Sequence, residues 1–246
     1  MNSDQNIDFR LNPDLDLPAL ARQFRAAGRI QIRDALDIGT AEFLRSVLQN
    51  RTNWGLAWQI GAEGPRAIRY AETQALSDAE KLALCQKAGE AVGKGEYGFV
   101  YEQYAMLTAY LEQWDPTHPL NRLLEHLNDQ PFLGLVRQIS GVQSVIKAEA
   151  QATCFAPGHF LTEHDDLHSR DPRRVAYVLN LTIPDWKSEW GGYLNFFDEH
   201  GNIEAGFRPM FNSLNMFLVP QRHSVSHVVP FAPVGRYAIT GWAMDP

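Results

Sequence analysis

The residues from 144 to 246 form short apolar runs that are cut by glycine, proline, asparagine and aspartate. Runs of this length, separated by turn residues, are typical of strands. Several such strands at regular spacing predict an antiparallel sandwich or barrel. The expected strands cover 145–155, 175–182, 193–197, 213–219, 224–229 and 237–243.

The residues before 144 are mainly helical in pattern. Ser77 and Glu80 form a capping-box pattern at the start of one helix, which we expect to run through Cys85. Apolar residues at helical spacing predict the other helices. These cover 18–27, 40–49, 120–127 and 132–139, with Thr40 as the expected N-cap of the second and one strand expected at 29–33. A length of 246 residues allows one large domain or two small ones.

Composition limits the partners and the compartment. Lys and Arg number 22 against 29 Asp and Glu, which gives a formal net charge of −7, so a broad phosphate-binding surface is not expected. Two cysteines, Cys85 and Cys154, do not form a disulfide framework. Neither a signal-peptide pattern nor a membrane-length apolar run is visible. We therefore expect a cytoplasmic protein that binds no nucleic acid directly and no membrane.

The segment 155–166 carries the strongest chemical signal. His164 and Asp166 are two positions apart, so in an extended chain their side chains point to one face. An imidazole and a carboxylate on one face are two of the three ligands of a facial triad for non-haem Fe(II). His227, in a later β-like run, is the expected third ligand. His223, four residues earlier, is expected to be a structural histidine.

Arg236 lies nine positions after His227, at the start of an apolar and aromatic run. An unpaired arginine buried in such a run is costly, but a bound carboxylate would supply a partner for its forked donors. A dicarboxylic keto-acid could therefore chelate iron at one end and meet Arg236 at the other.

The array resembles the Fe(II)/2-oxoglutarate-dependent dioxygenases of the prolyl-hydroxylase branch. That family shows His-x-Asp, a later His and a basic residue nine to ten positions further on. The resemblance also covers the sequence between these residues. It is closest to the microbial group that includes ribosomal-protein prolyl 3-hydroxylases. The matching stretches are 174–180 (RVAYVLN), Trp186, 191–194 (GGYL) and 236–242 (RYAITGW).

The resemblance implies a role for each matching residue. His164, Asp166 and His227 would be the catalytic iron ligands. Arg236 would bind the distal carboxylate of 2-oxoglutarate, with Tyr177 as a second donor. Further residues implied in the pocket are Thr240 beside the cosubstrate, and Trp242 and Asn180 beside the substrate. One departure is Cys154, which stands ten residues before His164 where oxygen-sensing relatives have a tyrosine.

The resemblance also implies an α+β fold with a double-stranded β-helix, or jelly-roll, core. Residues 1–246 would form a single domain, with 1–143 as helical support and 144–246 as the strands that carry the metal site. The implied activity is hydroxylation of a prolyl residue in a protein, with Fe(II), 2-oxoglutarate, O2 and ascorbate as a reductant. The acidic charge would suit a basic substrate such as a protein of the translation machinery. A monomer and a homodimer are both open.

Other interpretations remain open at this level. The substrate could be a free amino acid or small molecule, and the domain could be a non-catalytic binding module of the same fold. His164 and His168 are also spaced like the two ligands of a zinc-protease helix. The aromatic cluster at 97–104 is expected to be mainly core, with part of it as the alternative edge of a substrate groove.

Overall fold

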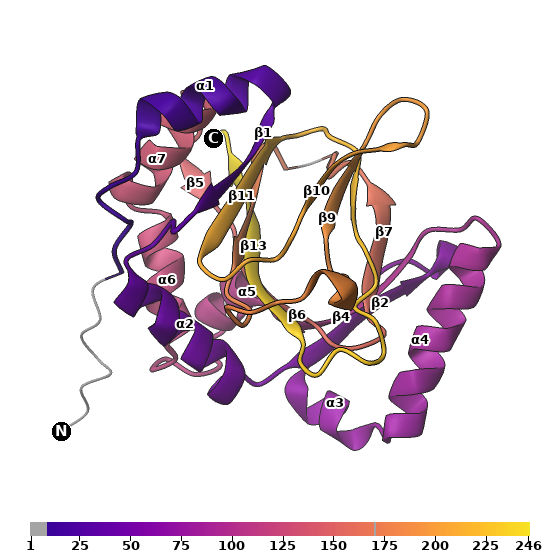
Figure 1. Ribbon diagram of the computed structural model, residues 1–246. Helices are drawn as coiled ribbons and strands as arrows, with labels where there is room; N and C mark the ends of the chain where they lie inside the picture. Colours follow the sequence, from indigo (N-terminus) through magenta and orange to yellow (C-terminus); the bar gives the residue numbers. More distant parts are fainter. Residues whose placement is uncertain (1–8, 170) are drawn as a thin grey trace.

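The computed structural model describes residues 9–169 and 171–246, which form seven α-helices around one large antiparallel sheet (Figure 1). The strands are β1 (Arg29–Arg33), β2 (Gly55–Ile60), β3 (Arg66–Ile68), β4 (Gly98–Tyr104), β5 (Lys147–Ala148), β6 (Gln151–Phe155), β7 (Phe160–His164), β8 (Arg173–Asn180), β9 (Leu194–Phe197), β10 (Ile203–Phe207), β11 (Ser213–Leu218), β12 (His223–Val225) and β13 (Arg236–Met244).

The strands follow the order β1-β11-β8-β13-β6-β4-β7-β12-β9-β10, with β2 and β3 extending from β4 and β5 paired with β13. This sheet folds back on itself into a nearly closed barrel, as expected for a jelly roll. The expected α+β jelly-roll fold is therefore confirmed.

The helices are α1 (Leu17–Ala27), α2 (Ile38–Asn50), α3 (Tyr70–Ala75), α4 (Asp78–Gly93), α5 (Met106–Leu111), α6 (Pro119–Leu127) and α7 (Gln130–Ser140). The capping box of α4 is present: the backbone N–H of Glu80 donates to the Ser77 hydroxyl, and that of Ser77 donates to the Glu80 carboxylate. The helix continues well past Cys85. Asp37, not Thr40, caps α2. Among the described residues no helix is long and apolar enough to cross a membrane.

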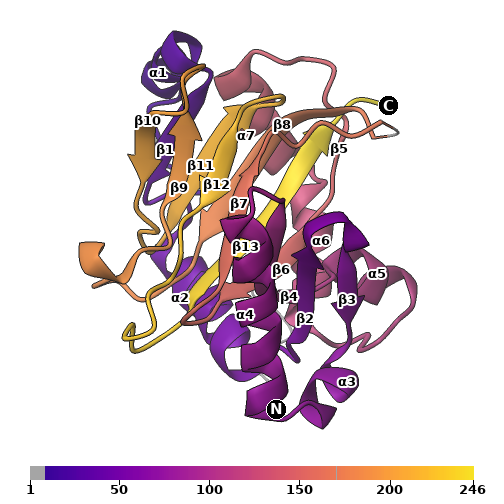
Figure 2. The same ribbon diagram turned by 90° about the vertical axis from the view of Figure 1, so that its right-hand side faces the viewer.

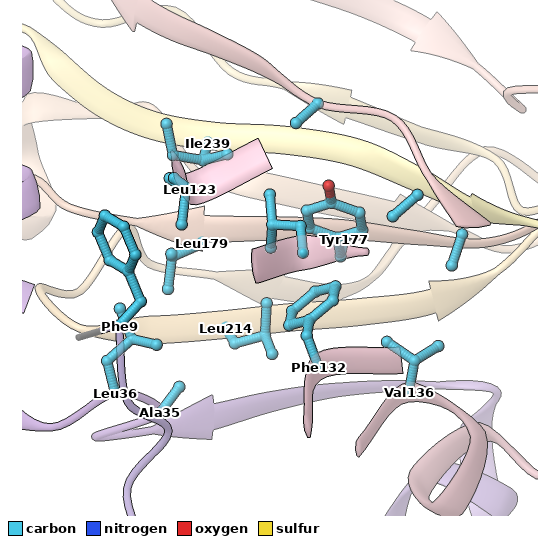
Figure 3. Packing of buried hydrophobic residues seen from close by; sticks show 14 of the residues in the cluster. Phe9, Ala35, Leu36, Leu123, Phe132, Val136, Tyr177, Leu179, Leu214 and Ile239 are labelled. Carbon is cyan, nitrogen blue, oxygen red and sulfur yellow. The ribbon is translucent and has the colours of Figure 1, made fainter. Parts of the chain in front are cut away.

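Helices α1, α2, α6 and α7 cover the outer face of the sheet (Figure 1). Figure 3 shows the packing: Phe132 of α7 meets the ring of Tyr177 on β8, beside Leu179, Leu214 and Ile239. A separate small cluster packs α4 against β2 and β4. Figure 2 shows α4 lying across these strands, away from α1. The helices therefore support the barrel from outside, and its interior stays available for a site.

The first half of the chain contributes more strands than its helical pattern indicates. Strands β2, β3 and β4 lie before residue 144 and join the same sheet as the later strands. The division into a helical half and a strand half is therefore too simple. Strand β4 covers most of the aromatic segment, where the sequence predicted buried core without assigning a strand.

Strand alternation separates the two faces of the central strands. On β8, Val175, Tyr177 and Leu179 face the helices, whereas Ala176 and Val178 face the barrel interior. On β13, Ile239 and Ala243 face the helices. The interior positions of that strand are Arg236, Ala238, Thr240 and Trp242.

Candidate metal centre

Three side chains meet at the mouth of the barrel. His164 ends β7 and His223 begins β12, and the two are direct cross-strand partners. Asp166 follows two residues after His164. Among the described residues these three form the group of ligand atoms that could hold a metal ion, all within 4.8 Å of one another. Two imidazoles and a carboxylate are the donor set of a facial-triad iron site.

Both imidazoles are oriented by backbone carbonyls. Nδ1 of His164 lies 3.0 Å from the carbonyl oxygen of Thr162, and Nδ1 of His223 lies 2.7 Å from that of Gln221. In the tautomer where Nδ1–H donates these bonds, each Nε2 presents a lone pair to the centre of the group. A second hydrogen bond that fixes the ring in this way is typical of metal-binding histidines.

The electrostatics of the group favour an ionised carboxylate beside imidazoles. Burial alone would raise the pKa of Asp166, but the hydrogen bond from His164, the nearby His223 and the Trp242 indole lower it to about 2. Burial opposes the charged form of His164, yet Asp166 raises its pKa overall. Burial and repulsion by His164 lower the pKa of His223 to about 4. A bound cation would interact favourably with the ionised Asp166.

His164 and Asp166 reach one point by a turn, not by strand alternation. Strand β7 ends at His164, and Asp166 has a φ of +64°, in the left-handed region that non-glycine residues rarely adopt. The expectation that the two side chains lie together is therefore correct, although the extended-chain argument for it is not. A strained backbone at such a position is common at functional sites.

His227 is not the third member of the group, which corrects the sequence prediction. Strand β12 ends at Val225, and the exposed His227 stacks its ring on Phe160 with 4.3 Å between ring centroids. His223 takes its place because it is the residue in register with His164. His223, which the sequence predicted to be structural, therefore belongs to the candidate metal-binding group.

The zinc-protease alternative receives no support from the geometry. His168 lies outside the metal-binding group, and its Nδ1 pairs with the Asp171 carboxylate at 2.8 Å. The segment that follows His164 is a loop and not a helix, so His164 and His168 do not share a helical face.

The group opens into a cavity of about 540 Å³ inside the barrel. Arg236 lies on its wall and is 1% exposed. Its Nη2 donates to Asn180 Oδ1 at 3.3 Å, and its guanidinium lies 5.3 Å from the centroid of the Phe155 ring. Its Nε has no hydrogen-bond partner among the described residues. Burial lowers the pKa of Arg236 to about 10. A buried guanidinium without a carboxylate partner fits the distal carboxylate of a bound dicarboxylate.

The other predicted pocket residues divide by strand face. Thr240 and Trp242 line the cavity as expected. Asn180 is fully buried behind Arg236, where it accepts a hydrogen bond from that guanidinium and donates one to the Ser213 hydroxyl. The Asn180 side chain therefore orients Arg236, and it is not part of the cavity wall.

Tyr177 borders the cavity, but its ring packs on Phe132 of α7 and its hydroxyl donates to the Glu149 carbonyl oxygen at 2.6 Å. In this structure the hydroxyl therefore does not contact Arg236, beside which a second donor was expected. Cys154 lies away from the cavity wall, which its neighbours Thr153 and Phe155 line instead. The residue that departs from the pattern of the oxygen-sensing relatives therefore does not line the cavity of this protein.

An aromatic wall on the cavity is the main feature that sequence reasoning underestimated. Tyr97, Phe99, Tyr101 and Phe155 line it, and their rings follow one another with centroids 5.9, 5.3 and 5.1 Å apart. Tyr97 also lies edge-on to the His164 ring. The sequence did contain a signal for this wall: the aromatic residues of 97–101 stand at odd-numbered positions, and alternate positions of a strand share a face.

Comparison with known proteins gives a consistent result. Residues 150–244 match the family model of the 2OG-Fe(II) oxygenase superfamily. This segment contains His164, Asp166, His223 and Arg236. No curated protein matches the sequence.

Several solved structures share the fold. A Pseudomonas putida prolyl-4-hydroxylase is 19% identical, with a TM-score of 0.58 over 94% of this chain and 99% of that one. A 2OG-Fe(II) oxygenase family oxidoreductase from Burkholderia pseudomallei is 14% identical, with a TM-score of 0.59 over 96% and 93%. A Trichoplax adhaerens prolyl hydroxylase, in complex with a hypoxia inducible factor peptide fragment, is 17% identical, with a TM-score of 0.50 over 93% and 89%.

Proposed function

We propose that this protein, whose residues 150–244 match the 2OG-Fe(II) oxygenase superfamily, is an Fe(II)- and 2-oxoglutarate-dependent hydroxylase of a prolyl residue in a protein or peptide. The observation that carries the proposal is the placement of His164, Asp166 and His223 in one cavity with a buried, carboxylate-free Arg236. The first three fit a ferrous ion, and the fourth fits the far end of its cosubstrate.

When bound, iron and 2-oxoglutarate supply the oxidation, in which O2 and 2-oxoglutarate yield succinate, CO2 and a hydroxylated C–H bond. The protein contributes binding and orientation. His164 and His223 present Nε2 atoms whose direction is set by the Thr162 and Gln221 carbonyls. Arg236, aligned by Asn180, holds the distal carboxylate in an apolar environment that excludes water. Ascorbate is the proposed reductant that keeps the iron ferrous.

The prolyl substrate is supported by the fold and by the cavity. The Pseudomonas putida and Trichoplax adhaerens neighbours are prolyl hydroxylases, and the second is in complex with a peptide fragment. In this chain an aromatic wall runs from Phe155 to Tyr97, beside His164, and such surfaces pack well against proline rings. We propose a basic protein of the translation machinery as substrate, because the net charge of −7 favours a cationic partner. We also propose a cytoplasmic protein that acts as a monomer or homodimer.

The test is succinate production from 2-oxoglutarate with Fe(II) and O2, followed by mass spectrometry of candidate peptides. The proposal predicts succinate in proportion to peptides that gain one oxygen atom at proline. Succinate without peptide oxidation, but with oxidation of a free amino acid, would favour the small-molecule alternative. No succinate from a metal-loaded protein would favour the non-catalytic binding module.

A further inference from the structure

Arg173 lies between the loop that carries Asp166 and the indole of Trp242. Its guanidinium carbon lies 3.7 Å from the centroid of the Trp242 ring. Its Nη1 donates to the backbone carbonyl of Asp166 at 3.4 Å, and its Nη2 lies 3.6 Å from the Asp171 carboxylate. One side chain therefore contacts the metal-ligand residue, the far end of its loop and the cavity wall.

The backbone at Asp166 needs such support. It lies beyond the end of β7, so no strand pairing fixes it, and its φ of +64° is a conformation that aspartate adopts at a cost. The Asp166 carboxylate nevertheless lies 3.4 Å from both His164 Nε2 and His223 Nε2. A contact at the carbonyl of the same residue restrains the backbone from which that carboxylate projects.

We propose that Arg173 is a positioning residue for the metal ligand Asp166, holding its backbone carbonyl while stacked on Trp242. The inference rests on the proposed function only in that it takes His164, Asp166 and His223 as the metal site. Arginine suits this place because a planar guanidinium can stack on an aromatic face while its edge donates hydrogen bonds. Lysine offers the charge without that plane.

The next residue provides a matched control. Arg174 also lies on β8, but it is exposed and does not line the cavity, and its Nη1 pairs with the Asp245 carboxylate at 2.8 Å. Arg174→Met removes the same charge and the same donors from the same strand, without touching the metal loop.

The experiment measures binding of Co(II) alone, an air-stable substitute for Fe(II), to the full-length protein by titration and by its visible absorption spectrum. Loss of a residue that supports a metal ligand typically weakens metal binding by about 10- to 100-fold. We expect Arg173→Met to raise the Kd for Co(II) by about tenfold or more and to alter the spectrum. Arg173→Lys should give an intermediate Kd, and Arg174→Met the wild-type Kd and spectrum.

Wild-type affinity and spectrum in Arg173→Met would overturn the inference, as would equal weakening in Arg174→Met. If Arg173→Met does not unfold cooperatively, Arg173→Lys decides: a raised Kd supports the inference and a wild-type Kd overturns it. Failure of the proposed function gives a different result. In that case His223→Ala would bind Co(II) as well as the wild-type protein does, or the wild-type protein would bind none.

Discussion

Nε2 of His223 lies 3.4 Å from Oδ2 of Asp166, while Oδ1 of the same carboxylate lies 3.4 Å from Nε2 of His164. One carboxylate thus faces two imidazoles from paired strands. On this relationship we propose His223 as the third metal ligand, a role for which the sequence pattern favoured His227.

The first prediction follows from that assignment. His223→Ala removes one of three ligands and should weaken Co(II) or Fe(II) binding by at least about 100-fold. His227→Ala removes a ring that stacks on Phe160 outside the metal-binding group, so metal affinity should stay within about twofold of wild type. Titration of the metal-free protein measures both. The opposite ranking would restore His227 as the ligand.

A second prediction concerns Arg236. Arg236→Met keeps the apolar stem but removes the donors for a carboxylate, a change that costs about 2 kcal/mol or more when the pair is buried. We expect the KM for 2-oxoglutarate to rise by about 30-fold or more, with Co(II) affinity in the absence of 2-oxoglutarate unchanged. Arg33→Met, at an exposed end of β1, is the matched control. An unchanged KM in Arg236→Met would place the cosubstrate elsewhere.

Much of the fold was predictable because it depends on local patterns. Helices α1, α6 and α7 and the late strands β8, β9, β11 and β13 lie within a few residues of their expected positions. Strand β7 escaped detection because its sequence, FLTEH, is mixed in polarity: Phe160 packs in the cluster beneath α4, whereas Leu161 and His164 line the cavity. Strand β10, at the sheet edge, has no clear apolar face.

The site was predictable in its chemistry but not in its register. His223 and His227 are four residues apart, and both lie in sequence that is typical of a strand. Only the cross-strand pairing shows that His223 lies opposite His164. The direction of the Tyr177 ring, which packs on Phe132 of α7, was not predictable for a related reason, because a slip of one residue exchanges the two faces of a strand. The interior position is Val178, next along β8.

A third prediction concerns the Gly-Gly pair between β8 and β9. Gly191 has a φ of +70°, and a Cβ there would overlap the carbonyl oxygen of His227. Gly201 has a φ of +81° with open space around it. Gly201→Ala should therefore cost only the left-handed backbone penalty, about 1 kcal/mol, whereas Gly191→Ala should cost about 3 kcal/mol because backbone must also move.

Urea unfolding of both glycine variants gives the two free energies of unfolding. Equal losses would show that the close approach to His227 is relieved by a small shift. A larger loss in Gly191→Ala alone would show that the loop before Arg236 is tightly held.

A fourth prediction concerns the pH dependence of stability. Burial lowers the pKa of His159 to about 4, and its Nδ1 accepts the Ala156 backbone N–H at 3.1 Å. Because its ordinary pKa is near 6.5, the unfolded chain takes up this proton first. The contribution of the neutral His159 to the free energy of unfolding is therefore complete above about pH 6.5. It is lost as the pH falls toward 4. At pH 5 the loss from this group is about 2 kcal/mol.

Comparison of His159→Gln with wild type at pH 7.5 and pH 5 isolates that contribution. From pH 7.5 to pH 5, the free energy of unfolding should fall by about 2 kcal/mol less in the variant than in wild type. His200→Gln, at an exposed turn, should keep the wild-type difference. If the free energy of unfolding of His159→Gln falls between the two pH values by as much as that of wild type, the His159 imidazole is not held in a buried, neutral form.

The most direct test of the account is succinate formation from 2-oxoglutarate under Fe(II) and O2 by wild type, His223→Ala and His227→Ala. The account predicts turnover by wild type and by His227→Ala, and none by His223→Ala. No turnover by metal-loaded wild type, or turnover that survives His223→Ala but not His227→Ala, would contradict it.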